Sequence, residues 1–92
     1  DDVSSAFTEK FGGKSFNEIV AQTLYRFCQG MKVCVEIVLM AADAGLISVD
    51  GEVIAIAGTG EGADTAIVVT PAYPRKFLDL KVKEVIAKPW SG

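Results

Sequence analysis

The spacing of hydrophobic residues changes along this chain, and each change marks a different kind of element. Between positions 15 and 30, apolar side chains recur every three or four residues, which is typical of an amphipathic helix. Ser15 and Glu18 have the spacing of a capping box at its start, and Gly30 is a residue type that ends helices. We therefore predict a helix over residues 15–30, preceded by a polar connector over residues 1–14.

Residues 31–47 are mostly apolar and fit two structures. The run 33–39 would suit a buried strand by propensity alone. The length of the segment and its alanine-rich second half favour a buried helix, because strands seldom exceed about eight residues. We therefore predict a second helix over residues 31–47.

Three strands are predicted in the rest of the chain, over residues 52–58, 65–70 and 80–87. The first two are apolar runs without alternation, a pattern typical of strands buried on both faces. The third alternates polar and apolar residues, as a half-exposed edge strand does. Since two helices cover only one face of such a sheet, the pattern predicts that something else covers the other face.

The amino-acid composition also indicates that part of the apolar surface is covered by another polypeptide. The chain has 92 residues, enough for a single α/β domain or half of one, and 50% of them are hydrophobic, with a mean hydropathy of +0.34. This apolar content is high for a chain with so much surface relative to its volume. We expect another chain or a missing N-terminal half to complete the fold, and the protein to be an oligomer.

Charge and cysteine content exclude several classes of function. The net charge is −3 and the nine basic residues are scattered, so we expect no nucleic-acid partner. No uncharged apolar run reaches the roughly 18 residues of a membrane span, so we expect no membrane partner. Cys28 and Cys34 lack the spacing of a zinc site, and the chain has no histidine. Both are expected to be small buried side chains in a reducing, cytoplasmic compartment.

A glycine-rich loop between the first two predicted strands is the candidate binding site. Its glycines would let a ligand approach main-chain N–H groups, and its threonines and aspartate add side-chain contacts. A strand follows the loop and no Gly-Lys-Ser/Thr is present, which excludes the dinucleotide fingerprint and the P-loop. The alternative is a turn whose glycines only satisfy its geometry. The candidate residues are Gly58, Thr59, Gly60, Gly62, Ala63, Asp64 and Thr65.

The other polar residues form no catalytic constellation. Glu36 and Asp43 fall on one helix face but about 10.5 Å apart along the axis, too far to share a metal or a proton. Glu36 is expected to pair with Lys32, four residues earlier. Arg75 and Lys76 could reach a ligand phosphate or could form a solvated turn. Because there is no nucleophile–base pair, we predict no catalytic residues and no metal site, and the sequence does not favour an enzyme.

Two motifs carry a resemblance to a known family, namely Lys32-Val33-Cys34-Val35-Glu36-Ile37 and Gly62-Ala63-Asp64-Thr65. Further matches extend the similarity over nearly all of residues 9–89. On these residues the chain resembles the stand-alone relatives of the pyruvate kinase C-terminal (alpha/beta) domain. Members of that family are longer, so the resemblance implies that this chain is the C-terminal half only.

The resemblance implies a three-layer α/β sandwich with a mixed, mostly parallel sheet. It implies no kinase activity, because these relatives lack the catalytic barrel, and a pocket at residues 58–65 for a phosphorylated ligand of the flavin mononucleotide (FMN) or sugar-phosphate type. Glu61 departs from the family pattern, since a basic residue is expected there and an acid would repel a phosphate. Two hypotheses follow: a module that binds a phosphorylated small molecule, or a structural half-domain that another chain completes without a ligand.

Overall fold

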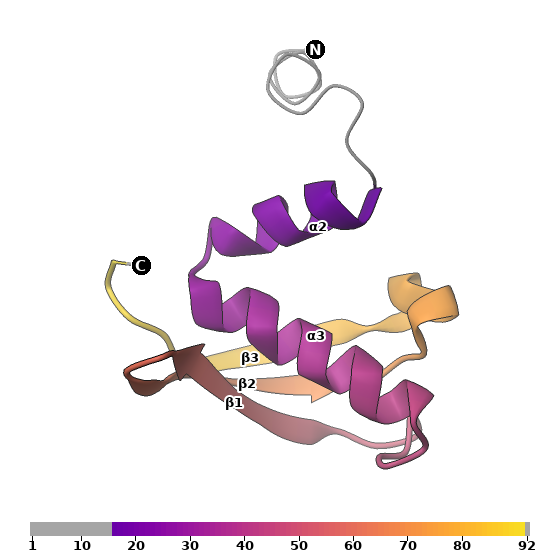
Figure 1. The fold of residues 1–92 in the computed structure, drawn as a ribbon. Helices are drawn as coiled ribbons and strands as arrows, with labels where there is room; N and C mark the ends of the chain where they lie inside the picture. The colour runs from indigo at the N-terminus through magenta and orange to yellow at the C-terminus, as the bar shows by residue number, and fades with distance from the viewer. Residues whose placement is uncertain (1–15, 92) are drawn as a thin grey trace.

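The structure, a computed structural model, describes residues 16–91; the connector predicted over residues 1–14 and the capping residue Ser15 lie outside the described residues. The two helices and three strands follow one another in the predicted order, and a short 3-10 helix that the sequence does not predict lies before the last strand (Figure 1). The elements are helices α2 (Phe16–Tyr25) and α3 (Gln29–Asp43), strands β1 (Val53–Thr59) and β2 (Gly62–Thr70), the short 3-10 helix η1 (Pro74–Asp79) and strand β3 (Lys81–Ala87).

The boundary between the two helices lies earlier in the sequence than predicted. Helix α2 ends at Tyr25 and α3 begins at Gln29, so Gly30 lies in the first turn of α3 and does not end the preceding helix. The predicted boundary at Gly30 is therefore wrong. Helix α3 ends at Asp43 rather than at 47, because the N–H of Leu46 donates to the carbonyl of Ala41 at 2.9 Å, a bond that closes the helix end.

The sheet has the order β1-β2-β3, and both neighbouring pairs are antiparallel. The expectation of a mixed, mostly parallel sheet is therefore wrong. The connections explain the difference, because only Gly60 and Glu61 join β1 to β2, and a two-residue turn reverses the chain. Strand β2 reaches β3 through η1, without the long crossover helix that parallel strands need.

Helices α2 and α3 lie on the same side of the sheet, so residues 16–91 do not form the expected three-layer sandwich, in which helices cover both faces (Figure 1). Helix α3 packs on one face of the sheet, against β1 and β2, and α2 packs on α3. The core lies between α3 and the sheet. Its buried side chains are Cys28, Met31, Cys34, Val35, Val38, Ala55, Ile67 and Val69.

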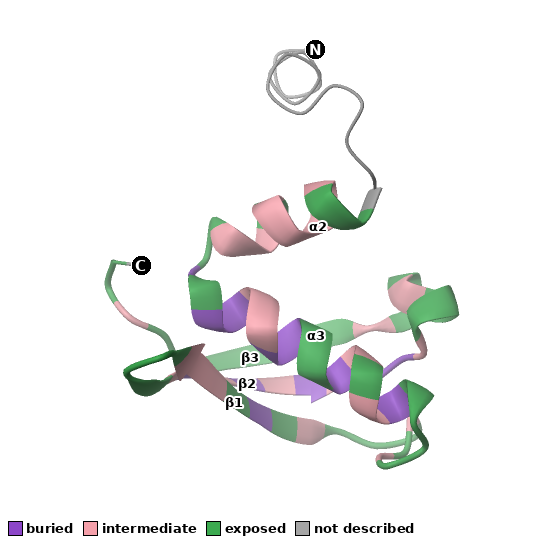
Figure 2. Ribbon diagram, in the orientation of Figure 1, coloured by how far each residue is buried: buried purple, intermediate pink, exposed green. Residues whose placement is uncertain are grey.

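The other face of the sheet is exposed (Figure 2). Along β1, Ala55 on the α3 side is 8% exposed, whereas Ile54 and Ile56 on the far side are 62% and 61% exposed. Within the described chain, the expectation of burial on both faces is therefore wrong for β1, and on β2 the outward Ala66 and Val68 are only partly buried. Hydrophobicity fails to alternate along β1 because the outward positions are also apolar.

Candidate functional site

The glycine-rich loop forms the exposed tip of the β1–β2 hairpin. Thr59 pairs with Gly62, and Gly60 and Glu61 make the turn between them. Gly62 has φ of 128°, a conformation that favours glycine over any residue with a side chain. The tip is convex and its residues 59–63 are exposed, so it does not by itself enclose a ligand.

A β-bulge follows the tip. The β1–β2 pairing skips Asp64, which lies between the paired residues Ala63 and Thr65. A Cβ added at Gly58, opposite the bulge, would overlap the carbonyl oxygen of Gly62. Gly58 and Gly62 are therefore required by the hairpin itself, which supports the interpretation of the loop as a turn.

The polar side chains of the loop have partners within the protein. The Thr59 hydroxyl accepts a hydrogen bond from the N–H of Glu61 at 3.3 Å. The Thr65 hydroxyl, in a residue only 2% exposed, donates to Oδ1 of Asp64 at 2.7 Å and lies 3.3 Å from Sγ of Cys28. A ligand at the tip would have to compete with these bonds for the threonine hydroxyls.

Asp64 and Thr65 also lie against the first turn of α3. A Cβ added at Gly30 would overlap the Thr65 hydroxyl and would stand 2.9 Å from Oδ1 of Asp64. Cys28 precedes the helix, and its side chain makes no capping hydrogen bond. The Asp64 carboxylate therefore lies beside the positive end of the α3 dipole, where a negative charge is favourable. The structure thus divides the predicted site: residues 58–63 form the tip, and residues 64 and 65 join the sheet to α3.

The two basic residues considered as phosphate ligands lie at the other end of the sheet. Arg75 and Lys76 belong to η1, which follows the end of β2 farthest from the hairpin tip (Figure 1). Both are exposed, and the Arg75 guanidinium lies 4.8 Å from the centre of the Tyr73 ring. This is the solvated turn of the two alternatives, and neither residue reaches residues 58–65.

The cysteines are free and buried, as expected. Sγ of Cys34 lies 3.6 Å from the carbonyl oxygen of Ala55, to which it donates. Burial raises the pKa of the Cys34 thiol, and the neighbouring Cys28 and Asp64 raise it further. Because the thiolate is the reactive form, Cys34 is a poor nucleophile at neutral pH. Within residues 16–91, no group of three or more histidine, cysteine, aspartate or glutamate side chains is arranged to hold a metal ion.

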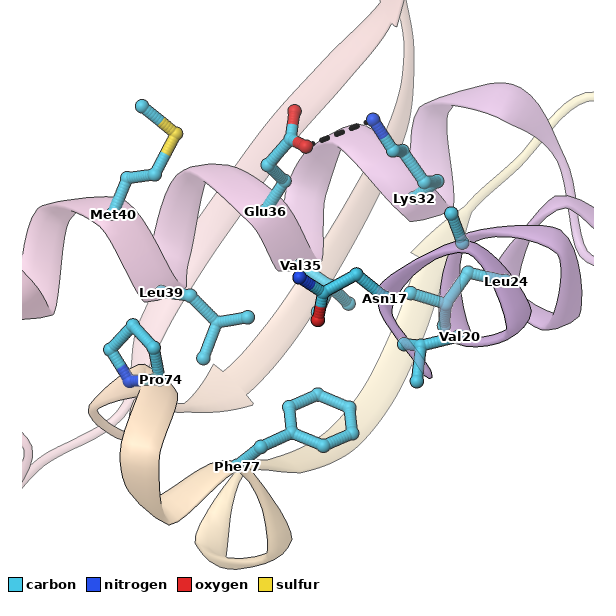
Figure 3. Close-up of a pocket in the computed structure, with 11 residues that line it drawn as sticks. Asn17, Val20, Leu24, Lys32, Val35, Glu36, Leu39, Met40, Pro74 and Phe77 are labelled. Atoms are coloured by element: carbon cyan, nitrogen blue, oxygen red, sulfur yellow. Dashed lines mark hydrogen bonds and ion pairs between the residues drawn. The ribbon is translucent and has the colours of Figure 1, made fainter. Parts of the chain in front are cut away.

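A groove that was not predicted lies between α2, α3 and η1 (Figure 3). Its volume is about 380 Å³, and most of its lining is apolar, including Leu24, Leu39 and Phe77. Nζ of Lys32 and Oε2 of Glu36 form an ion pair of 2.9 Å at its rim, which confirms the predicted pairing and raises the pKa of Lys32. Since these two charges satisfy each other, the groove offers mainly apolar contact. In the sequence its helical residues could not be distinguished from core positions.

No protein-family model matches the chain. The resemblance to the relatives of the pyruvate kinase C-terminal domain therefore stays a prediction. Among the described residues, none of the helices has both the length and the apolar character needed to cross a membrane.

Proposed function

We propose that this chain is an assembly module, a structural α/β unit whose exposed sheet face is completed by another polypeptide. The observation that carries the proposal is the asymmetry of the sheet. On the α3 side, Ile67 and Val69 are 0% exposed, whereas Ile54 and Ile56 on the far side are more than half exposed. Contiguous apolar surface of this kind usually marks an interaction site.

The apolar surface extends from the exposed isoleucines of β1 onto β2, where Ala66 and Val68 are partly exposed. Val68 is the antiparallel partner of Ile54, and Ala66 is the partner of Ile56, so the four side chains share the outer face and form what we call the outer patch. Covering the exposed parts of the two isoleucines would contribute about 2–4 kcal/mol to association. This is a large gain relative to the total stability of a small domain, about 5–15 kcal/mol.

The proposal includes a cytoplasmic location. Two free cysteines are buried in the core, and a reducing compartment keeps such thiols from forming wrong disulfides. No kinase activity is proposed, and no catalytic residue is assigned.

Size-exclusion chromatography with light scattering tests the proposal. The parent is expected to have a mass above the 9.8 kDa of one chain. The double variant Ile54→Lys/Ile56→Lys should reduce the mass to that of one chain while circular dichroism stays that of a folded protein. The matched control is Leu46→Lys/Leu78→Lys, which adds the same charge at two exposed leucines outside the sheet. A folded parent that is monomeric at every concentration, or an assembly that the outer-patch variant does not affect, would contradict the proposal.

A second candidate function is the binding of a phosphorylated small molecule, of the FMN or sugar-phosphate type, at residues 58–65. The observation that favours it is that residues 59–63 at the glycine-rich tip are exposed, so a ligand can approach their main-chain N–H groups. A thermal-shift panel of FMN, nucleotides and sugar phosphates tests it. If no compound raises the midpoint at millimolar concentration, this candidate fails.

A further inference from the structure

We infer that the free edge of β1 is an assembly surface and that β1 of a second copy occupies it, paired antiparallel so that two three-stranded sheets become one. This inference rests on the proposed assembly function and names its surface and its partner. In the described residues β1 and β3 are the two edges of the sheet, because β2 lies between them. The two edges differ in their chemistry.

The edge at β3 is protected against pairing and the edge at β1 is not. Strand β3 carries Lys81, Lys83 and Glu84 among its seven residues. Strand β1 has no charged residue and no proline over Val53–Thr59. Charged side chains and proline are the features by which proteins keep edge strands from pairing with other chains. The missing protection therefore indicates that β1 pairs in the assembled protein.

The side of α3 above β1 is also free of charge. Lys32 and Glu36 lie on the opposite side of the helix, at the groove formed with α2 and η1. Val33, Ile37 and Ala41 follow one another at four-residue spacing on the other flank, and Ile37 is 46% exposed. Because η1 and β3 lie on the groove side, this flank faces the β1 edge (Figure 1). Strand and helix thus offer one continuous uncharged surface.

The segment Ile54-Ala55-Ile56 at the centre of β1 is the same in both directions, and Val53 would lie opposite the small Ala57, which favours a second copy as the occupant. Centred on Ala55, antiparallel pairing places Ile54 of one copy opposite Ile56 of the other on the outer face. The outer patches then join across the two-fold axis. Ala55 lies opposite its own counterpart beneath the helices, where a small side chain leaves room.

The helices also fit this arrangement. The two-fold axis keeps both copies of α3 on the same side of the joined sheet. With adjacent strands about 4.8 Å apart and α3 lying over β1 and β2, the two α3 axes would be about 10 Å apart, within the usual range for packed helices. The flanks that carry Ile37 would then face each other.

Cross-linking tests the register directly. In the double variant Ile54→Cys/Ile56→Cys, mild oxidation is expected to join position 54 of one copy to position 56 of the other, as mapped by peptide mass spectrometry. The control is Lys81→Cys/Glu84→Cys on the protected edge, whose β2 partners Thr70 and Val68 are two residues apart on the outer face, and it should give no interchain link. The native cysteines are 0% exposed and should not take part.

Sedimentation velocity tests the helix flank. Ile37→Glu places like charges across the axis and should raise the dimer dissociation constant at least about tenfold. Met40→Glu is the control, since Met40 is 64% exposed and lines the groove, and it should change the constant by less than about twofold. Suppose that Ile54→Lys/Ile56→Lys disrupts the assembly, but Ile37→Glu does not affect it and no 54–56 link forms. That combination would overturn the β1 pairing and leave the assembly proposal standing. A folded, monomeric parent would overturn both.

Discussion

Gly30 of α3 lies so close to Thr65 of β2 that no side chain fits between them. A Cβ at position 30 would stand 2.7 Å from the Thr65 Cβ and would overlap the threonine hydroxyl. This contact sets how closely α3 approaches the sheet. It also explains why a glycine occupies a helical position, where it costs about 1 kcal/mol relative to alanine.

Replacing this glycine should therefore destabilise the protein despite the better helix propensity of alanine. We expect Gly30→Ala to lower the free energy of unfolding by about 1–2 kcal/mol, because the overlap with Thr65 forces the helix or the strand to shift. Urea denaturation measures the change. Gly51→Ala is the matched control, since its surroundings are open, and should stay within about 0.5 kcal/mol. A Gly30→Ala protein more stable than the parent would show that the contact is not restrictive.

The Thr65 hydroxyl is expected to contribute to stability rather than to ligand binding. Thr65→Val keeps the size of the side chain but removes the donor to Asp64, and should cost about 1–2 kcal/mol of unfolding free energy. Thr23→Val removes an exposed hydroxyl that donates to the carbonyl of Ile19, and should cost less than about 0.5 kcal/mol. Equal effects of the two substitutions in urea denaturation would argue against a structural role for Thr65.

The buried thiol of Cys34 predicts a loss of stability at alkaline pH. Its pKa in the folded protein lies above the ordinary value of 9.0, so above pH 9.0 the unfolded chain ionises while the folded chain keeps its proton. Stability is therefore full below pH 9.0 and falls as the pH rises above it. The difference in unfolding free energy between the parent and Cys34→Ala should shrink between pH 8 and about pH 10, as thermal or urea denaturation would measure. A difference that stays constant would contradict the raised pKa.

Glu61 distinguishes the two candidate functions. If the tip is only a turn, Glu61→Arg should leave the free energy of unfolding within about 0.5 kcal/mol of the parent, because the side chain is exposed, and should not change the thermal shift with FMN. If the loop binds phosphate, removal of the acid should tighten binding by about 1–2 kcal/mol. That gain should weaken as salt concentration rises. The assembly account predicts the first result.

The local elements follow from the sequence because their signals are local. Each signal depends only on residues a few positions apart in the sequence: the helical spacing, the β-branched runs and the Lys32–Glu36 pair. The structure contains all of them. The helix boundary at Gly30 is predicted wrongly because the sequence alone does not distinguish a glycine that ends a helix from one that packs against Thr65.

Strand direction and face burial were predicted less well, for different reasons. The parallel sheet came from the family resemblance, whereas the connection between the predicted strands, residues 59–64, is already too short for the crossover that neighbouring parallel strands need. Ile54 and Ile56 are predicted to be buried because hydrophobicity does not show whether a strand is covered by its own chain or by another chain. The groove depends on how η1 approaches α2 and α3, which no local pattern specifies.

Hydrogen exchange of the β1 amides is the measurement that tests the central claim most directly. The 92-residue chain is compared at low and high concentration, with the β3 amides over Lys81–Ala87 as the internal reference for an unpaired edge. If another chain pairs with β1, protection over Val53–Thr59 should rise with protein concentration, while β3 should not change. Equal exchange at both edges, independent of concentration, would contradict assembly through β1.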